Sequence, residues 1–206
     1  MSKLFDLEAP IWGWMNEVAD IIILSMLWWI SCCGIITIGA STTAVFYVLG
    51  KKVRKEPHHV FGDFVKSFKD NFKQSIPLTI IYDLAAISCI SYGSMIINGL
   101  LTPEASSSLV YIVPLAIIML FAFWNYGSYL WAILSRYEMK TKVLCKTAFV
   151  MTHRHLISTV VNTLLCGATV WLMIVFPMAI IVAPGLVILV QSYLMQNLFS
   201  RYTTTE

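Results

Sequence analysis

Charged residues are scarce in this sequence: Asp, Glu, Lys and Arg make up 12% of its 206 residues, whereas hydrophobic residues make up 58%. Soluble domains usually contain about a quarter charged and about half apolar residues. The low charge and the mean hydropathy of +0.77 therefore exclude an ordinary soluble domain. They predict an integral membrane protein that forms one domain over residues 1–206, is surrounded by the lipid bilayer and has no nucleic-acid partner.

The sequence also lacks the residue patterns of common catalytic and metal sites. It contains no Gly-rich phosphate loop, no H-E-x-x-H or G-x-S-x-G motif and no pair of glutamates on an apolar segment. His58 and His59 are adjacent, and His153 and His155 are two apart, so on helices their side chains point in different directions and complete no usual metal spacing. We therefore expect no enzyme activity, no catalytic residues, no metal and no cofactor.

Paired cysteines are missing as well. The five cysteines are an odd number without a C-x-x-C spacing, and four of them lie in apolar segments. This pattern is typical of small core residues and not of a disulfide or metal framework. The cysteines are Cys32, Cys33, Cys89, Cys145 and Cys166. A removable secretory signal is not expected, because the first 20 residues carry four acidic residues and no small-residue cleavage site.

Long hydrophobic runs are abundant, and they set the predicted architecture. A helix needs roughly 20 apolar residues to cross about 30 Å of hydrocarbon. Residues 156–200 are too long for one span, and Pro177 with the Pro184-Gly185 pair divides them. The sequence thus predicts an all-α, polytopic transmembrane helical bundle of about five spans. Their approximate ranges are 18–38, 76–100, 109–134, 156–176 and 182–200.

The distribution of Lys and Arg orients these spans, since short loops rich in basic residues stay on the cytoplasmic side. Seven basic residues fall within 51–74 and five within 136–155, whereas the N-terminal arm has one Lys against four acidic residues. The loop near 102–104 has no basic residue, and the hairpin near Pro177 has no charge. We therefore predict that the N-terminus lies outside and the C-terminus in the cytoplasm.

Two basic segments between the spans have the pattern of amphipathic helices, at about 60–75 and 138–155. In the first, four phenylalanines recur at helical spacing on one face, and charged residues surround them. Such a helix suits the inner membrane interface, where each Lys adds on the order of 1 kcal/mol near an anionic leaflet. Its aromatic face can instead pack within the chain or dock on a partner protein. The four residues are Phe61, Phe64, Phe68 and Phe72.

Small and hydroxyl-bearing residues interrupt the first apolar run and predict a bend with close helix packing. From Val18 to Gly50 a straight helix would measure about 50 Å, which exceeds the hydrocarbon core. Glycines allow the bend and the close approach of a neighbouring helix, and the hydroxyls can bond back to carbonyls or cap a new helix. A ligand-binding role is the alternative. The residues are Gly34, Gly39, Ser41, Thr42 and Thr43.

Two polar features within the predicted spans are candidate contacts for a ligand or partner. Asp83 lies about two turns into the second span, where an ionised carboxylate costs roughly 1 to 3 kcal/mol and commonly faces a cavity or a partner. In the third span, Trp124–Tyr129 forms a polar aromatic patch. Its Asn125 and Tyr129, together with Arg136, have the hydrogen-bonding edges and stacking faces of a sugar-binding cleft. The alternatives are structural hydrogen bonds between helices and anchoring at the membrane interface.

An ordered set of residues carries a resemblance to a known family. The set comprises Trp28, the block Thr37–Ala44 with the sequence TIGASTTA, Tyr47, the spaced phenylalanines, Asn71–Gln74 and Tyr129–Tyr137. In this order the chain resembles the YesL-like family of bacterial integral membrane proteins, a domain of unknown function. Two positions depart from the family pattern: Gly34 stands where a proline is frequent, and Ser25 where an asparagine is frequent.

The resemblance implies a bacterial plasma-membrane protein associated with carbohydrate-uptake systems that include ABC-type sugar permeases, and it implies no catalytic residues. On this basis we expect a non-enzymatic accessory component of carbohydrate uptake and utilisation. Its expected partners are sugar-permease subunits or a second copy of the chain. The alternative is a small carrier or membrane sensor with its own ligand site near Asp83 and Trp124–Tyr129.

Overall fold

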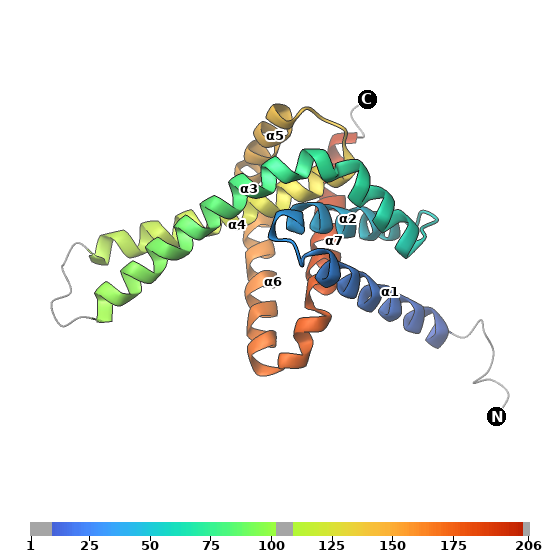
Figure 1. The fold of residues 1–206 in the computed structure, drawn as a ribbon, viewed down its shortest axis with the longest axis horizontal. Coiled ribbons are helices and arrows are strands. Elements are labelled where there is room, and N and C mark those ends of the chain that lie inside the picture. Colours follow the sequence, from blue (N-terminus) through green and yellow to red (C-terminus); the bar gives the residue numbers. More distant parts are fainter. Residues whose placement is uncertain (1–9, 102–108, 204–206) are drawn as a thin grey trace.

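The computed structural model describes residues 10–101 and 109–203, and all regular elements in these ranges are helices. This confirms the all-α prediction for the part of the chain that is described (Figure 1). The elements are α1 Pro10–Ser31, the 3-10 helix η2 Ile35–Thr37, α2 Ile38–Val53, α3 Val60–Leu101, α4 Leu109–Arg136, α5 Thr141–Arg154, α6 Leu156–Val175, the 3-10 helix η3 Pro177–Ile181 and α7 Ala183–Thr203.

The helices diverge from a common centre (Figure 1). α3 and α4 run side by side as a long pair in one direction, α6 and α7 form a second pair that points in another, and α1 extends in a third. α2 lies where these arms meet and contacts α1, α3, α4 and α7. The core of the molecule is therefore built around α2.

α2 is the most completely enclosed helix of the centre. Ala40, Ala44, Val45, Val48 and Leu49 have no exposed surface. With 16 residues, α2 is about 24 Å long, which is shorter than the roughly 30 Å of membrane hydrocarbon. Its small residues let the neighbouring helices approach closely, so α2 serves as a packing element at the centre of the bundle.

The bend in the first apolar run is a reversal of the chain. Gly34 lies between α1 and η2 in an extended conformation, with φ −96° and ψ 115°. α2 then starts as a separate helix, in which Ser41, Thr42 and Thr43 donate to the carbonyls four residues earlier at 2.9, 2.7 and 2.8 Å. Gly39 lies in close contact with both α3 and α4, because a Cβ atom there would overlap side chains of both helices.

Three helices, α3, α4 and α6, are long and apolar enough to cross a membrane, as judged over the described residues. Many of their large apolar side chains face outward; Ile81, Ile118 and Leu164, for example, are 67, 61 and 67% exposed. Water would disfavour such a surface, whereas lipid chains would cover it. These helices indicate a membrane protein, although they do not confirm the predicted number of five spans.

The predicted amphipathic helix at 60–75 and the span at 76–100 form one continuous helix. α3 has 42 residues, which corresponds to about 63 Å, and Pro77 lies inside it without ending it. Phe64 is buried and stacks on Phe68 with 6.2 Å between ring centres, and Phe72 follows at 5.5 Å from Phe68. Much of the aromatic face therefore packs within the chain, while Phe61 is 65% exposed.

The structure does not show the predicted separation of an outer acidic arm from an inner basic segment by residues 18–38. Lys52 Nζ lies 2.9 Å from Asp20 Oδ2, and His58 Nε2 lies 3.6 Å from the same oxygen. Groups in contact cannot stand on opposite sides of about 30 Å of hydrocarbon. α1 and α2 thus form an antiparallel hairpin whose charged ends meet. Counting basic residues loop by loop missed this ion pair; the residues before Pro10 and the loop at 102–104 lie outside the described ranges.

Candidate functional site: an arginine pocket on the basic face

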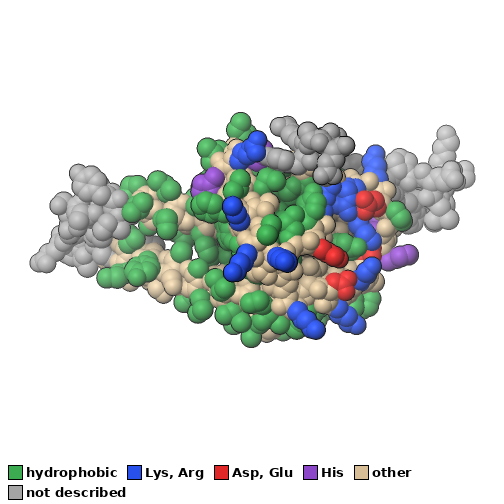
Figure 2. All heavy atoms as spheres, turned by 90° about the horizontal axis from the view of Figure 1, so that it is seen from above, with side chains coloured by type: hydrophobic (Ala, Val, Ile, Leu, Met, Phe, Trp, Pro, Cys, Tyr) green, Lys and Arg blue, Asp and Glu red, His purple; other side chains and the backbone are tan. Residues whose placement is uncertain are grey.

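Both basic segments lie on one face of the molecule. Gln74 Nε2 in α3 donates to the carbonyl of Met139 at 2.8 Å, which ties the first segment to the loop before α5. Figure 2 shows Lys and Arg side chains spread over this face, with acidic side chains among them. Between the two segments lies a groove of about 620 Å³. Its charged and amide side chains are Lys66, Asp70, Asn71, Gln74, Arg136, Glu138 and Lys140.

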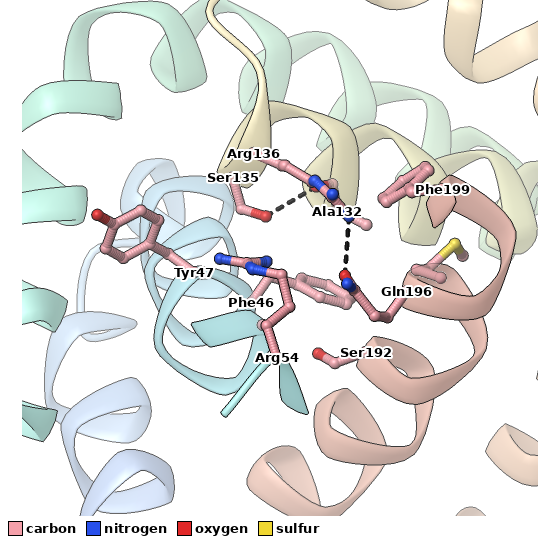
Figure 3. A pocket seen from close by; sticks show the side chains of 11 residues that line it. Phe46, Tyr47, Arg54, Ala132, Ser135, Arg136, Ser192, Gln196 and Phe199 are labelled. Carbon is pink, nitrogen blue, oxygen red and sulfur yellow. Dashed lines mark hydrogen bonds between the residues drawn. The ribbon is translucent and has the colours of Figure 1, made fainter. Parts of the chain in front are cut away.

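A small pocket adjoins this groove and shares Tyr47, Ser135 and Arg136 with it. It lies where the ends of α2, α4 and α7 meet, and Figure 3 shows Arg54 and Arg136 along its lining. Its free volume is about 30 Å³, which is room for about two water-sized groups. We call this site the arginine pocket.

Both arginines of the pocket are held in place by neighbouring groups. Arg54 donates through Nε and Nη2 to the carboxylate of Glu56 at 2.7 and 3.0 Å. Arg136 donates through Nη1 to Gln196 Oε1 at 2.8 Å, and its guanidinium lies 5.5 Å from the ring centres of two aromatic residues. Because a guanidinium has five N–H donors, each arginine keeps donors for a further acceptor.

A buried hydroxyl completes the lining of the arginine pocket. Ser192 in α7 is 4% exposed, and its Oγ has no hydrogen-bond partner among the described residues. Most buried polar atoms in proteins are paired, so an unpaired hydroxyl in a pocket wall marks a place where a polar ligand or a water fits.

The charge around the arginine pocket is predominantly positive. Hydrogen bonds from Arg54 lower the pKa of the Glu56 carboxyl, and the charges of Lys51 and Arg136 lower it further. Glu56 is therefore ionised at neutral pH and offsets one of the two guanidinium charges. The arrangement can hold an anion but offers no nucleophile with a neighbouring base.

A second set of charges fixes the end of α2 to the start of α3. Lys51 Nζ lies 3.0 Å from Asp63 Oδ1, and Asp63 Oδ2 accepts the backbone N–H of His59 at 3.0 Å. Burial raises the pKa of Asp63, but the bonds from His59 and Lys51 outweigh it, so this pKa lies below its usual value. The bond to Asp63 raises the pKa of Lys51. These contacts position the segment that carries Arg54.

A larger cavity of about 320 Å³ shares Phe46 with the arginine pocket and is lined by residues of α1, α2, α3, α4, α6 and α7. Its aromatic lining consists of Trp28, Phe46, Tyr82, Trp124 and Trp131. Thr42 also faces it, and its Oγ1 accepts the indole N–H of Trp28 at 3.1 Å. The cavity suits an apolar molecule or chain, since a sugar would lose water there and find few polar partners.

The predicted candidates Asp83, Asn125, Tyr129 and Arg136 do not form one cleft. Asn125 Nδ2 donates to Thr163 Oγ1 at 2.7 Å, and Asn125 Oδ1 accepts from Asn162 at 2.9 Å, so Asn125 joins α4 to α6. Tyr129 has no exposed surface. Both residues therefore belong to the interior, and Arg136 is the candidate that lines the arginine pocket.

Asp83 lies apart from the other candidates. It is partly exposed on α3, and within the described ranges no hydrogen bond or ion pair joins it to another side chain. Its neighbour Tyr82 points into the bundle, where its ring stacks on Phe123 with 4.3 Å between ring centres. Of the aromatic patch, Trp124 and Ser128 do line the apolar cavity.

Sequence reasoning did not select Arg54, Ser192 or Gln196. Arg54 entered only as one member of a basic segment. The other two lie in the predicted span at 182–200, which also contains Gln191. Several amide and hydroxyl side chains within one apolar run were the available signal, because a helix surrounded by lipid rarely carries them without partners.

A family model supports part of the resemblance. The model of a family described as "Protein of unknown function, DUF624" matches residues 21–93. This range contains the reversal, the central helix α2 and most of α3. The match does not confirm the YesL-like name, and it leaves α4 to α7 uncovered. No curated protein and no solved structure matches the chain.

Proposed function

We propose that the chain is a non-enzymatic protein of the bacterial plasma membrane that assists carbohydrate uptake by binding a membrane-embedded sugar permease. The supporting observation is an outward face of α3 that the described residues leave uncovered. Ile80, Leu84, Ile87 and Ile90 on this face are 41, 61, 60 and 69% exposed. Asp83 lies among them, and a carboxylate at membrane depth favours a partner that donates hydrogen bonds or carries a positive charge.

The proposal includes a specific arrangement in the membrane. α3, α4, α6 and α7 cross it, whereas the α1–α2 hairpin enters and leaves on the cytoplasmic side, so both termini are cytoplasmic. The contact between Asp20 and Lys52 supports this arrangement, together with the tendency of basic segments to remain inside.

Cysteine labelling tests the arrangement in a variant without the native cysteines. Met15→Cys in α1 and Lys69→Cys in α3 should react with a membrane-impermeant maleimide only after the cells are opened. Met178→Cys in η3 should react in intact cells, since Met178 is 82% exposed. It lies in the connection between α6 and α7, at the end of this pair that is remote from the basic face. Reaction of Met15→Cys in intact cells would place the N-terminus outside.

Photo-crosslinking tests the docking role in cells that are taking up sugar. A photoreactive phenylalanine at Leu84 or Ile87 should yield adducts with a permease subunit, identified by mass spectrometry. The control is Ile174, which is 74% exposed on α6 and should give lipid adducts only. Asp83→Asn should reduce both the crosslink yield and the sugar uptake of a complemented deletion strain. Adducts solely with lipid, or solely with copies of the same chain, would contradict the proposal.

A second candidate is a small carrier or membrane sensor with its own ligand site. The cavity lined by Trp124 and Ser128 favours it, because its volume of about 320 Å³ is in the range of small-molecule sites. Trp124→Ala and Ser128→Leu would then abolish complementation, while Asp83→Asn would have no effect. The opposite pattern supports docking on a permease.

A further inference from the structure

We propose that the arginine pocket and the adjoining groove together bind a phosphate ester: two phosphate oxygens lie in the pocket, which has room for about two water-sized groups, and the hydroxyl-rich part lies in the groove. The inference concerns a ligand site on the basic face, whereas the proposed role in uptake depends on the outward face of α3. Either can therefore fail without the other.

Two cations line this pocket, and among the described residues one carboxylate, that of Glu56, pairs with them. Arg54 comes from the end of α2 and Arg136 from the end of α4, and Glu56 compensates one of them. Arginine forks match pairs of phosphate oxygens, and a charge-assisted bond to each fork is stronger than a neutral one. An anion between the two guanidinium groups would remove the remaining repulsion between like charges.

The unpaired hydroxyl of Ser192 points independently to a ligand in the pocket. It is buried, it lines the same pocket as both arginines, and it comes from a third helix. A phosphate oxygen accepts hydrogen bonds from hydroxyl and guanidinium groups alike. Figure 3 shows Ser192 and Gln196 on α7 along one side of the pocket and Arg54 along another, so donors surround the space in which an oxyanion would lie.

The groove next to the pocket sets the chemistry of the rest of the ligand. Apart from Arg136, which it shares with the pocket, the groove carries Lys66 and Lys140 against Asp70 and Glu138, so these four charges balance. A second phosphate would meet these carboxylates, which disfavours it. Carboxylate and amide oxygens accept hydrogen bonds from alcohol groups, and Asn71 adds an amide. A neutral polyol that bears one phosphate therefore fits the pocket and the groove together.

Such a group has two sources, a soluble sugar or glycerol phosphate and the headgroup of a glycerol phospholipid. The experiment has one arm for each. In the first, the purified full chain in uncharged detergent is titrated calorimetrically with glucose 6-phosphate, glycerol 3-phosphate, inorganic phosphate and glucose. In the second, native mass spectrometry counts lipids retained from nanodiscs of phosphatidylcholine with and without phosphatidylglycerol.

Variants assign the binding to the pocket. Arg54→Gln and Arg136→Gln should each weaken binding about tenfold or more, since each removes a charge-assisted bond to the phosphate. Ser192→Ala should weaken it several-fold while leaving the thermal unfolding midpoint unchanged or higher, because it removes an unpaired buried hydroxyl. Lys69→Gln, an exposed residue of the same face outside the groove, should change affinity less than about twofold and controls for general charge.

The outcomes separate clearly. Binding of the soluble esters but not of glucose supports the site and assigns it a soluble ligand, and selective retention of phosphatidylglycerol supports the site with a lipid headgroup. If neither arm shows binding, or if the Arg54, Arg136 and Ser192 variants bind as the unchanged chain does, the inference is overturned. If Arg136→Gln does not fold, Arg54→Gln and Ser192→Ala still test the site, because both residues line the same pocket on other helices.

Discussion

α2 and the outer half of α3 are neighbouring apolar helices with opposite surroundings. In α2, Ala44, Val48 and Leu49 have no exposed surface, whereas in α3 Leu84 and Ile87 are 61 and 60% exposed. α2 is short, carries small residues on the faces that meet other helices, and is surrounded by protein. The outer part of α3 carries large branched residues, and the described residues leave them exposed to lipid or to a partner protein.

The difference shows that hydropathy alone does not tell a membrane-facing helix from a buried one. Length and residue size separate them: a helix of about 24 Å with glycine and alanine packs against protein, and a longer one with leucine and isoleucine can face lipid. If this is so, matched substitutions in α2 and in the outer part of α3 should differ in their cost.

The largest expected difference between the two helices is the loss of unfolding free energy when a leucine is replaced by alanine. Leu49→Ala in α2 should lower the free energy of unfolding by about 3 kcal/mol, because it leaves a cavity in a closely packed centre. Leu84→Ala in α3 should lower it by less than about 0.5 kcal/mol. Unfolding by SDS in mixed micelles measures both. Equal losses would mean that α2 is not the protein-enclosed core.

Adding a methyl group should show the same contrast on a smaller scale. Gly39→Ala in α2 places a Cβ against Thr79 and Trp131, and the resulting overpacking should cost about 2 kcal/mol. Gly93→Ala in α3 meets no atom within 4 Å and should stabilise the helix slightly, by up to about 1 kcal/mol. The same SDS titration compares the two variants. A Gly39→Ala protein as stable as the unchanged chain would mean that α3 and α4 do not approach α2 closely.

The smallest expected effect is at the charged junction between the two helices. The lowered pKa of Asp63 means that its ion pair with Lys51 adds stability above about pH 4 and loses it as the pH falls through the folded-state pKa. Asp63→Asn should therefore cost up to about 1 kcal/mol at pH 7 and progressively less below pH 4.

The raised pKa of Lys51 predicts a matching loss of stability at high pH, as Lys51 deprotonates above about pH 10. Thermal unfolding at a series of pH values tests both limbs. Asp70→Asn, an exposed residue of the same helix, is the control and should not show the pH-dependent difference of Asp63→Asn. A constant cost of Asp63→Asn at every pH would show that its charge is not involved.

The helices themselves follow from local sequence patterns. Apolar runs and the spacing of phenylalanines predicted an all-helical chain, because length and periodicity are local properties, whereas the break between α1 and α2 and the continuity of α3 were not predicted. The reversal at Gly34 was predicted only as a bend, since a glycine permits many conformations. The contact of Asp20 with Lys52 decides its direction, and no local pattern encodes a contact 32 residues apart.

The arginine pocket was harder to predict for the same reason. Arg54, Arg136 and Ser192 come from three separate segments, and each has an ordinary explanation where it stands in the sequence. Asn125 was a different case. The sequence indicated a polar residue in an apolar span, but it did not indicate which residues of α6 bond to it. Its cross-helix bonding was among the alternatives, and the structure places it in that role.

The unbroken course of α3 has a mechanical consequence. Its first turns border the groove through Lys66 and Asn71, and its distant turns carry Asp83 and Ile90 on the outward face. A stiff rod cannot absorb a displacement along its length, except near Pro77, where one helical hydrogen bond is missing. A tilt imposed at the groove is therefore carried along the helix as far as Pro77, and the stiffness at Pro77 sets how much of it reaches the far end.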